Sequence, residues 1–287
     1  MMFLLTSPKR KPNLVKTVKS NNSDNDALTD LLLDLASPIR YSILSKLDQK
    51  DWKQSKLAQE LDITLPESHR QFERLSNAGL ISKSIEGTYR ITSFGRIILQ
   101  QIQSISFMHR FKEYFSSHSV LGLPEKFVKR ISELNECEII EGAFVISEKM
   151  KEIASGSKYL KVVSAHVPPD AFRHGLVSAE KTKKQVQIIY AKNTLIPKGL
   201  KKEFTSSRVQ SLLNAGTYER KMIDSVKIYV VLDEKNAMVL FPDLKGNVDL
   251  SCAFVSDDPK FHEWCSDYHQ YLWVSAGSFN ASYLKES

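Results

Sequence analysis

Side chains that can read a base edge or neutralise a phosphate are concentrated between residues 64 and 90. Arg70 has the most specific chemistry, because its planar guanidinium matches the two acceptors that guanine presents in the major groove. Glu67 can accept a hydrogen bond from cytosine, and Thr64 can cap a helix or donate to a phosphate. The full set of candidates for nucleic-acid contact is Thr64, Leu65, Glu67, Ser68, His69, Arg70, Arg74, Lys83, Thr88, Tyr89 and Arg90. For each single position, the alternative is a solvated surface residue.

The apolar pattern around these residues predicts the helices and the hairpin that would position them. Apolar residues at helical spacing predict four successive helices, over 27–35, 38–47, 55–61 and 66–78. Ser37 and Pro38 predict the start of the second helix, and Gly79 predicts the end of the fourth. Two short strands, 80–83 and 89–92, follow as a hairpin around the Glu86-Gly87 turn. The expected core of this small domain consists of Leu57, Leu61, Ile63, Phe72 and Leu75.

Part of this segment resembles a known family of DNA-binding proteins. Residues 57–64 (LAQELDIT), the helix that carries Arg70, and residues 77–81 (NAGLI) resemble the helix-turn-helix core of ArsR-like winged-helix transcriptional regulators. The resemblance implies an α+β winged helix-turn-helix domain over residues 26–92 that binds double-stranded operator DNA. Metal sensors of this type cluster cysteines or histidines, but residues 1–136 contain no cysteine, and His109 and His118 do not share a helix face. We therefore expect no metal site and no cofactor.

The segments on either side of this domain predict an arm and a linking helix. Residues 1–25 are expected to be a disordered basic arm, because residues 1–20 hold five Lys or Arg and no acidic residue. Such an arm can neutralise phosphates or enter a minor groove, although a solvated tail is the alternative. Residues 93–122 are expected to form a long linker with a helix over 93–116. Its apolar stripe is expected to pair with a second copy or to pack on its own chain. The predicted dimerisation residues are Ile98, Ile102, Ile105 and Met108.

The second half alternates strand and helix patterns, which predicts an α/β domain over residues 123–275, followed by a tail over 276–287. The expected strands are 160–165, 186–191, 225–232, 237–241 and 250–255. The expected helices are 125–134, 143–154, 171–184, 198–214 and 259–273. The first of these helices, followed by residues 138–142 (EIIEG), resembles the second domain of archaeal methanogenesis and filament-formation regulators. That resemblance covers roughly residues 26–275. It implies a phospholipase-D-like fold, and TrmB-type sugar-sensing regulators share the general plan.

Phospholipase D chemistry requires the sequence His-x-Lys-x4-Asp, in which the histidine is the nucleophile. In the corresponding stretch, Ser225 stands in place of the histidine and Leu232 in place of the aspartate, while Lys227 is retained. Without the imidazole the covalent step is lost, so the implied fold is degenerate and we expect no enzyme activity. A pocket that has lost this chemistry would favour a small ligand. The ligand-contact candidates are His166, Arg173, His174, Tyr190, Lys192, Arg220 and Lys227. Three of them, Lys192, Arg220 and Lys227, could hold a small anionic effector, with ordinary surface charge as the alternative.

Composition sets the broad class of the protein. The chain has 287 residues, 42% hydrophobic and 25% charged, with a net charge of +7, which is ordinary for two folded domains. No apolar run is long enough to span a membrane, and three cysteines without CxxC spacing favour a reducing, cytoplasmic location. We expect a homodimeric, sequence-specific DNA-binding transcriptional regulator that responds to an effector. The alternatives are a protein-interaction module that uses the winged helix, or a nucleic-acid-processing enzyme.

Overall fold

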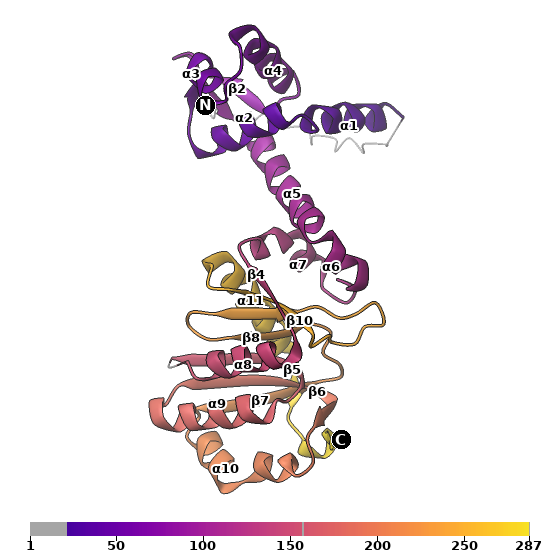
Figure 1. The fold of residues 1–287 in the computed structure, drawn as a ribbon, viewed down its shortest axis with the longest axis vertical. Helices are drawn as coiled ribbons and strands as arrows, with labels where there is room; N and C mark the ends of the chain where they lie inside the picture. The colour runs from indigo at the N-terminus through magenta and orange to yellow at the C-terminus, as the bar shows by residue number, and fades with distance from the viewer. Residues whose placement is uncertain (1–21, 157, 287) are drawn as a thin grey trace, which may run out of the picture. The chain divides into compact units, whose positions relative to one another are not determined.

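The computed structural model describes residues 22–156 and 158–286, and the chain divides into two compact units after residue 100 (Figure 1). Residues 1–21 of the predicted basic arm lie outside the described residues. Residues 22–25, which were expected to belong to that arm, are the first turn of a helix. None of the helices in the described residues combines the length and hydropathy needed to cross a membrane.

The first unit contains helices packed against a small antiparallel sheet. Its elements are α1 (Asn22–Leu35), α2 (Pro38–Gln49), β1 (Trp52–Lys53), α3 (Gln54–Glu60), α4 (Leu65–Asn77), β2 (Ile81–Lys83) and β3 (Thr88–Ile91). The three strands lie in the order β1-β3-β2. The predicted helices and the hairpin are present, whereas β1 was not predicted, because two residues give no periodic signal. Asp62 adopts φ +51° in the turn between α3 and α4, and Gly79 adopts φ +71° after α4.

The core of the first unit contains the predicted residues Leu57, Phe72 and Leu75, whereas Leu61 and Ile63 are only half-buried. It also contains a nearly buried arginine, Arg40, that the sequence did not indicate. The Arg40 guanidinium donates to the carbonyl oxygens of Leu33 and Asp34 at 2.9 and 2.5 Å, and to Gln71 Oε1 at 2.7 Å. These bonds satisfy the last carbonyls of α1 and connect α1, α2 and α4.

The long helix expected over 93–116 is divided into α5 (Ser93–Arg110) and α6 (Lys112–Ser117). The helix breaks at Phe111, where φ is −107° and ψ is 27°. The break brings the rings of Phe111 and Phe115 to 5.0 and 6.4 Å from the ring of Phe254. These aromatic side chains therefore pack within the second unit. This agrees with the expectation that the apolar stripe of this segment packs on its own chain.

The second unit is built on a mixed sheet. In the described residues, eight strands pair in the order β11-β7-β6-β5-β8-β9-β10-β4, and a ninth strand, β12, pairs with β6 outside that path. The strands are β4 (Glu138–Glu141), β5 (Tyr159–His166), β6 (Gln185–Ile196), β7 (Tyr218–Ile223), β8 (Tyr229–Leu232), β9 (Ala237–Leu240), β10 (Cys252–Ser256), β11 (Gly277–Ser278) and β12 (Lys285–Glu286). The pairs β5–β6, β6–β7 and β6–β12 are parallel, and the others are antiparallel.

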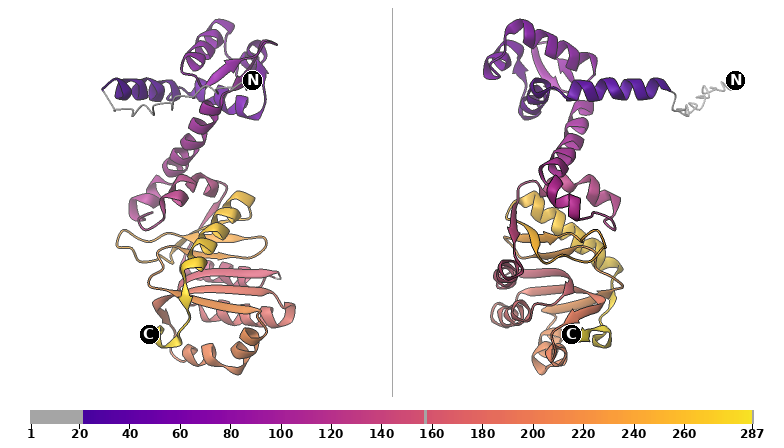
Figure 2. Two further views of the ribbon diagram at one scale, coloured as in Figure 1. Left: turned by 180° about the vertical axis from the view of Figure 1, so that it is seen from behind. Right: turned by 45° about the vertical axis from the view of Figure 1, so that its right-hand side comes forward.

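Helices cover both faces of this sheet (Figure 2). They are α7 (Glu125–Lys129), α8 (Ala143–Ala154), α9 (Pro169–Thr182), α10 (Ser207–Asn214) and α11 (Pro259–Ser275), with 3-10 turns at Ile131–Leu134, Leu200–Thr205 and Ala281–Tyr283. Successive residues of β5 point to opposite faces. Val162 packs in the core shared with α8 and α9, and Val163 packs in the core shared with α11. The result is a three-layer arrangement, with helices on either side of a central sheet.

Several boundaries in this unit differ from the sequence expectation. The predicted helices 125–134 and 198–214 are each divided into a 3-10 turn and a shorter α-helix. The predicted strand 225–232 begins only at Tyr229, which pairs with Leu240 at the end of β9, and the N–H of the next residue, Phe241, donates to the Tyr114 hydroxyl instead. The expected tail over 276–287 contributes β11 and β12, and its Leu284 is buried.

Candidate nucleic-acid interface and ligand cavity

The N-terminus of α4 is held by a side-chain cap. Thr64 lies in extended backbone before the helix, and its Oγ1 accepts a hydrogen bond from the N–H of Glu67 at 3.3 Å. Of the two roles considered for Thr64, the structure thus supplies the capping one. The prediction that Ser68 contacts nucleic acid is wrong. Its side chain is fully buried, and its hydroxyl has no hydrogen-bond partner within the described chain. Ser68 therefore faces the core and does not present a hydroxyl to phosphate.

The outer face of α4 presents side chains that differ in how strongly they are engaged. Leu65, His69 and Arg70 are exposed, and Glu67 is half-buried. Arg74 is exposed too, but its guanidinium pairs with the Asp34 carboxylate of α1 at 2.8 Å. No carboxylate in the described part of the chain lies within ion-pairing distance of Arg70. The Arg70 guanidinium therefore projects to solvent with its donors uncommitted.

The hairpin beside α4 divides its four predicted contact residues between structural and exposed roles. Tyr89 packs edge-on against Phe72 with ring centroids 4.7 Å apart, and the Thr88 hydroxyl lies 2.8 Å from Ser84 Oγ. Both side chains hold the hairpin together and are half-buried, so they are poorly placed for a ligand. Lys83 is exposed, with its ammonium 5.7 Å from the Tyr89 ring, and Arg90 pairs with Asp51 at 3.1 Å. Lys83 and Arg90 remain the cationic side chains that this hairpin can offer.

The predicted dimerisation residues do not lie on one exposed face. Ile98 and Ile102 are half-buried, and Ile98 packs against the core of the first unit. Met108 packs against the core of the second unit, whereas the Ile105 side chain is 65% exposed. Exposed apolar side chains of the first unit that were not among the predicted dimerisation residues include Leu28, Leu32 and Leu33 on α1 and Phe94 and Ile97 on α5.

The cations expected to hold an anionic effector are not brought together. Lys192 pairs with Asp224 at 2.7 Å, and Arg220 donates to the carbonyl of Phe204 at 2.8 Å. The Lys227 stem instead lies against Gly122. Arg173 pairs with Glu203 at 2.7 Å, and His174 is exposed on α9. No shared anion site joins these residues.

In the stretch that resembles the phospholipase D motif, the polar residues near the start are exposed and the residue in place of the aspartate is buried. Ser225 and Lys227 are exposed, but Leu232 is fully buried. The Asp233 carboxylate accepts hydrogen bonds from the backbone N–H groups of Lys235 and Asn236, at 2.8 and 2.7 Å, and so shapes the β8–β9 turn. Lys227 precedes β8 and Asp233 follows it, so the two side chains lie at opposite ends of that strand.

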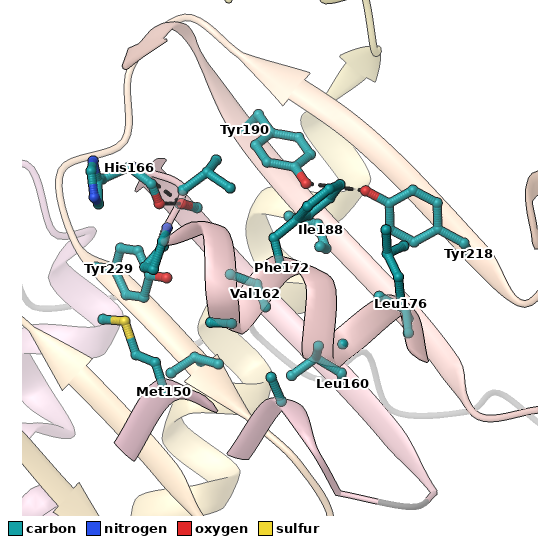
Figure 3. Close-up of a pocket in the computed structure, with 18 residues that line it drawn as sticks. Met150, Leu160, Val162, His166, Phe172, Leu176, Ile188, Tyr190, Tyr218 and Tyr229 are labelled. Atoms are coloured by element: carbon teal, nitrogen blue, oxygen red, sulfur yellow. Dashed lines mark hydrogen bonds between the residues drawn. The ribbon is translucent and has the colours of Figure 1, made fainter. Parts of the chain in front are cut away.

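Two of the ligand candidates, His166 and Tyr190, line a cavity of about 50 Å³ between the sheet and helices α8 and α9 (Figure 3). The wall is apolar except for a few groups, including Tyr218 and Tyr229, which the sequence did not single out. Burial raises the pKa of Tyr229 to about 12 and lowers the pKa of His166. These side chains are therefore neutral near pH 7, and the lining favours an uncharged occupant.

Comparison with known proteins places only the first part of the chain near a described family. The family model of the HVO_A0261 N-terminal domain matches residues 28–110, which is less than half of the chain. No curated protein matches the sequence.

Among solved structures, TrmBL2, described as an archaeal chromatin protein with a novel mode of DNA binding, has 13% identity and a TM-score of 0.37, covering 91% of this chain and 100% of that one. NucT from Helicobacter pylori has 13% identity and a TM-score of 0.37, covering 50% of this chain and 99% of that one. A phospholipase D family member, Nuc from Salmonella typhimurium, has 12% identity and a TM-score of 0.34, with the same coverage. These values are low, so the functional conclusion rests on the residues of this chain.

The two candidate sites differ in how far the sequence located them. The exposed residues of α4 follow from helical periodicity, because every outward position is set by the apolar residues that face inward. The cavity depends on residues from different strands, such as Tyr190 on β6 and Tyr218 on β7, whose pairing no local pattern specifies. Tyrosines at inward positions of adjacent strands were the only feature of the sequence that could have indicated this cavity.

Proposed function

We propose that this protein is a sequence-specific DNA-binding regulator of transcription, in which α2 to β3 act as a winged helix-turn-helix. The observation that carries the proposal is the exposed outer face of α4, on which Arg70 and His69 project and where none of the described carboxylates pairs with Arg70. At 13 residues, α4 is about 20 Å long, and an α-helix fits the width of the major groove. The Thr64 cap fixes the end of the helix from which these side chains reach outward.

The side chains of this face support distinct contacts. Arg70 would donate two hydrogen bonds to a guanine, whereas Leu65 can contact a thymine methyl group. Lys83 and Arg90 on the hairpin would contact phosphates, and so would the N-terminal arm. Arg74 would reach a phosphate by leaving Asp34, whose carboxylate would keep Arg40 as a cation 3.8 Å away.

We also propose that the regulator is a homodimer. On α1, the side chains of Leu28, Leu32 and Leu33 are more than half exposed, as is Ile97 on α5. Together with Phe94, Leu28 lines a hollow between α1, the end of α4 and the start of α5. Several exposed apolar side chains on neighbouring elements are typical of a protein–protein interface. A second copy would cover it and would present two α4 helices to two half-sites.

The proposed reading role of α4 is tested by comparing Arg70→Ala with Lys83→Ala on a duplex that the full chain binds and on copies of that duplex with single base-pair changes. Arg70→Ala is expected to weaken binding by about 1–3 kcal/mol and to relax the preference at one base position. Lys83→Ala is expected to weaken binding evenly across sequences and to reduce the salt slope by about one. Arg208→Ala is the matched control, because that arginine pairs with Glu180 on the surface of the second unit.

Fluorescence anisotropy over a salt series measures the affinity of each variant for each duplex and the salt dependence of that affinity. An equal loss at every sequence for Arg70→Ala would reduce Arg70 to a phosphate contact and would remove the reading role of α4. The absence of any salt-dependent binding would favour a protein-interaction module instead. Cleavage of the duplex, abolished by Lys227→Ala, would favour a nucleic-acid-processing enzyme.

A further inference from the structure

We propose that the cavity beneath α8 and α9 binds a small uncharged molecule whose apolar body carries one hydrogen-bond-accepting oxygen. This inference rests on the proposed function, because it names the chemical class of effector to which the regulator would respond. It replaces the anionic effector expected from the sequence. Three properties of the cavity support it, namely its wall, an unmatched hydroxyl proton and the placement of nearby charge.

The wall of the cavity is built by elements that meet only in the folded second unit. Strands β5 to β8 form its floor, and α8 and α9 form its roof. Met150, Leu160 and Phe172 are buried side chains of this wall, and Gly175 of α9 leaves room beside Leu160 (Figure 3). A cavity of about 50 Å³ with this lining suits an apolar body of a few heavy atoms.

One hydroxyl proton in the wall has no acceptor. Tyr190 and Tyr218 are each only 1% exposed, and their hydroxyl oxygens lie 3.1 Å apart, each being the other's partner. Two phenols carry two protons, but a single bond between them uses one. Within the described residues, no further acceptor is bonded to either oxygen. Because an unmatched buried donor is costly, this pair favours an occupant that offers an oxygen acceptor.

The Ser164 hydroxyl of the wall is satisfied without a ligand. Ser164 donates its proton to the carbonyl of His166 and accepts a hydrogen bond from the His166 N–H at 3.2 Å. The unmatched proton that the hydrogen bonds identify therefore belongs to the Tyr190–Tyr218 pair. A ligand with one acceptor oxygen is sufficient to bind that proton.

The charges around the cavity favour a neutral ligand over an anion. No lysine or arginine is among the lining residues, and His166 is neutral near pH 7 because burial lowers its pKa. The cation that acts on the tyrosine pair is Arg220, which opposes the rise that burial causes in the pKa of Tyr218. However, the Arg220 guanidinium donates to the Phe204 carbonyl and lies 4.2 Å from the centroid of the Phe279 ring. An anion in the cavity would lack a direct partner, and its desolvation would be costly.

Three planar probes of four heavy atoms each separate these possibilities: propanone, 2-methylpropene and acetate. The full chain, without DNA, is titrated with each probe while the ring resonances of labelled Tyr190, Tyr218 and Tyr229 are followed by NMR. Propanone is expected to shift the Tyr190 and Tyr218 resonances saturably. 2-Methylpropene is expected to bind about fivefold more weakly, the factor that one net hydrogen bond contributes. Acetate is expected to leave these resonances unchanged.

The double variant Tyr190→Phe with Tyr218→Phe removes both hydroxyls while retaining the apolar wall. It is expected to bind propanone and 2-methylpropene equally. Gly175→Ala adds a methyl group that would meet Leu160 Cδ2 at 3.4 Å, an ordinary contact, so the protein should fold and bind every probe more weakly. Tyr159→Phe is the control, because Tyr159 does not line the cavity and its hydroxyl is hydrogen-bonded to His262.

Acetate binding as tight as propanone binding would overturn the proposal. The absence of any saturable shift at Tyr190 and Tyr218 would overturn it too, because water or packing would then satisfy the two hydroxyls. DNA binding is measured separately on the same protein. Probe binding without DNA binding would leave the cavity site standing and would remove the proposed function. DNA binding without probe binding would remove only the cavity site.

Discussion

At the scale of single residues, the burial of polar side chains is the property that sequence patterns predict least well. Arg40 lies in a helix of otherwise ordinary polarity, yet its guanidinium reaches two carbonyls of α1 and the side chain of Gln71. The Gln71 side chain of α4 is thus engaged within the domain. Periodicity identified Phe72 and Leu75 correctly, because their apolar spacing fixes which face is inward. It could not identify Arg40, since a charged residue is buried only where distant acceptors meet it.

His269 predicts a dependence of stability on pH. The side chain is fully buried on α11, its Nε2 bonds to the Gln187 carbonyl, and burial followed by the charge of Lys161 lowers its pKa to about 4. Because the folded-state pKa is depressed, the unfolded chain binds the proton first as pH falls from about 6.5 to about 4. The stability contributed by neutral His269 is therefore complete above pH 6.5 and is lost below it.

The expected loss from this side chain between pH 7 and pH 4 is roughly 3 kcal/mol in the free energy of unfolding. Urea unfolding at a series of pH values measures it, with His269→Gln expected to show a smaller acid-dependent loss than the wild type. His109→Gln is the control, because His109 is exposed. Equal pH profiles for His269→Gln and the wild type would contradict the assignment.

At the scale of elements, the sequence located some helices closely and missed strands whose apolar residues do not alternate. The expected helix 143–154 matches α8 residue for residue, whereas β7 was missed because the three residues at its centre that follow Tyr218 are all charged. Its inward residues Tyr218 and Met222 gain their burial from parallel pairing with β6, a contact across a crossover that no local pattern specifies. The α4 surface was therefore accessible to sequence reasoning, and the cavity was not.

The packing of α5 against the hairpin predicts a strict requirement for glycine at position 95. A Cβ added there would lie 2.1 Å from the carbonyl oxygen of Leu80 and 2.9 Å from Ile91 Cγ1, so the helix would have to move. Gly95→Ala is expected to destabilise the protein by about 1–3 kcal/mol in urea unfolding, despite the better helix propensity of alanine. Gln100→Ala, at an exposed position of the same helix, should have little effect. Unchanged stability of Gly95→Ala would show that α5 does not pack this closely.

At the scale of the whole molecule, the proposed dimer depends on apolar side chains that the single chain leaves exposed. Leu28 and Leu32 are 53% and 55% exposed on α1, so their replacement by serine removes little packing within one copy. The double variant Leu28→Ser with Leu32→Ser is expected to sediment as a monomer with an unchanged circular dichroism spectrum. Leu244→Ser is the control, because Leu244 is equally exposed in the second unit. A variant that remains dimeric would show that α1 does not form the interface.

The central claim is that two copies of this chain read double-stranded DNA through α4. Its most direct test is the selection of bound sequences from random duplex DNA by the purified full chain at about 150 mM salt. The account predicts an enriched palindrome with half-sites about one helical turn apart, and the loss of one enriched base pair in each half-site when Arg70→Ala is used. Recovery of random sequences by the folded, dimeric wild-type protein would contradict it.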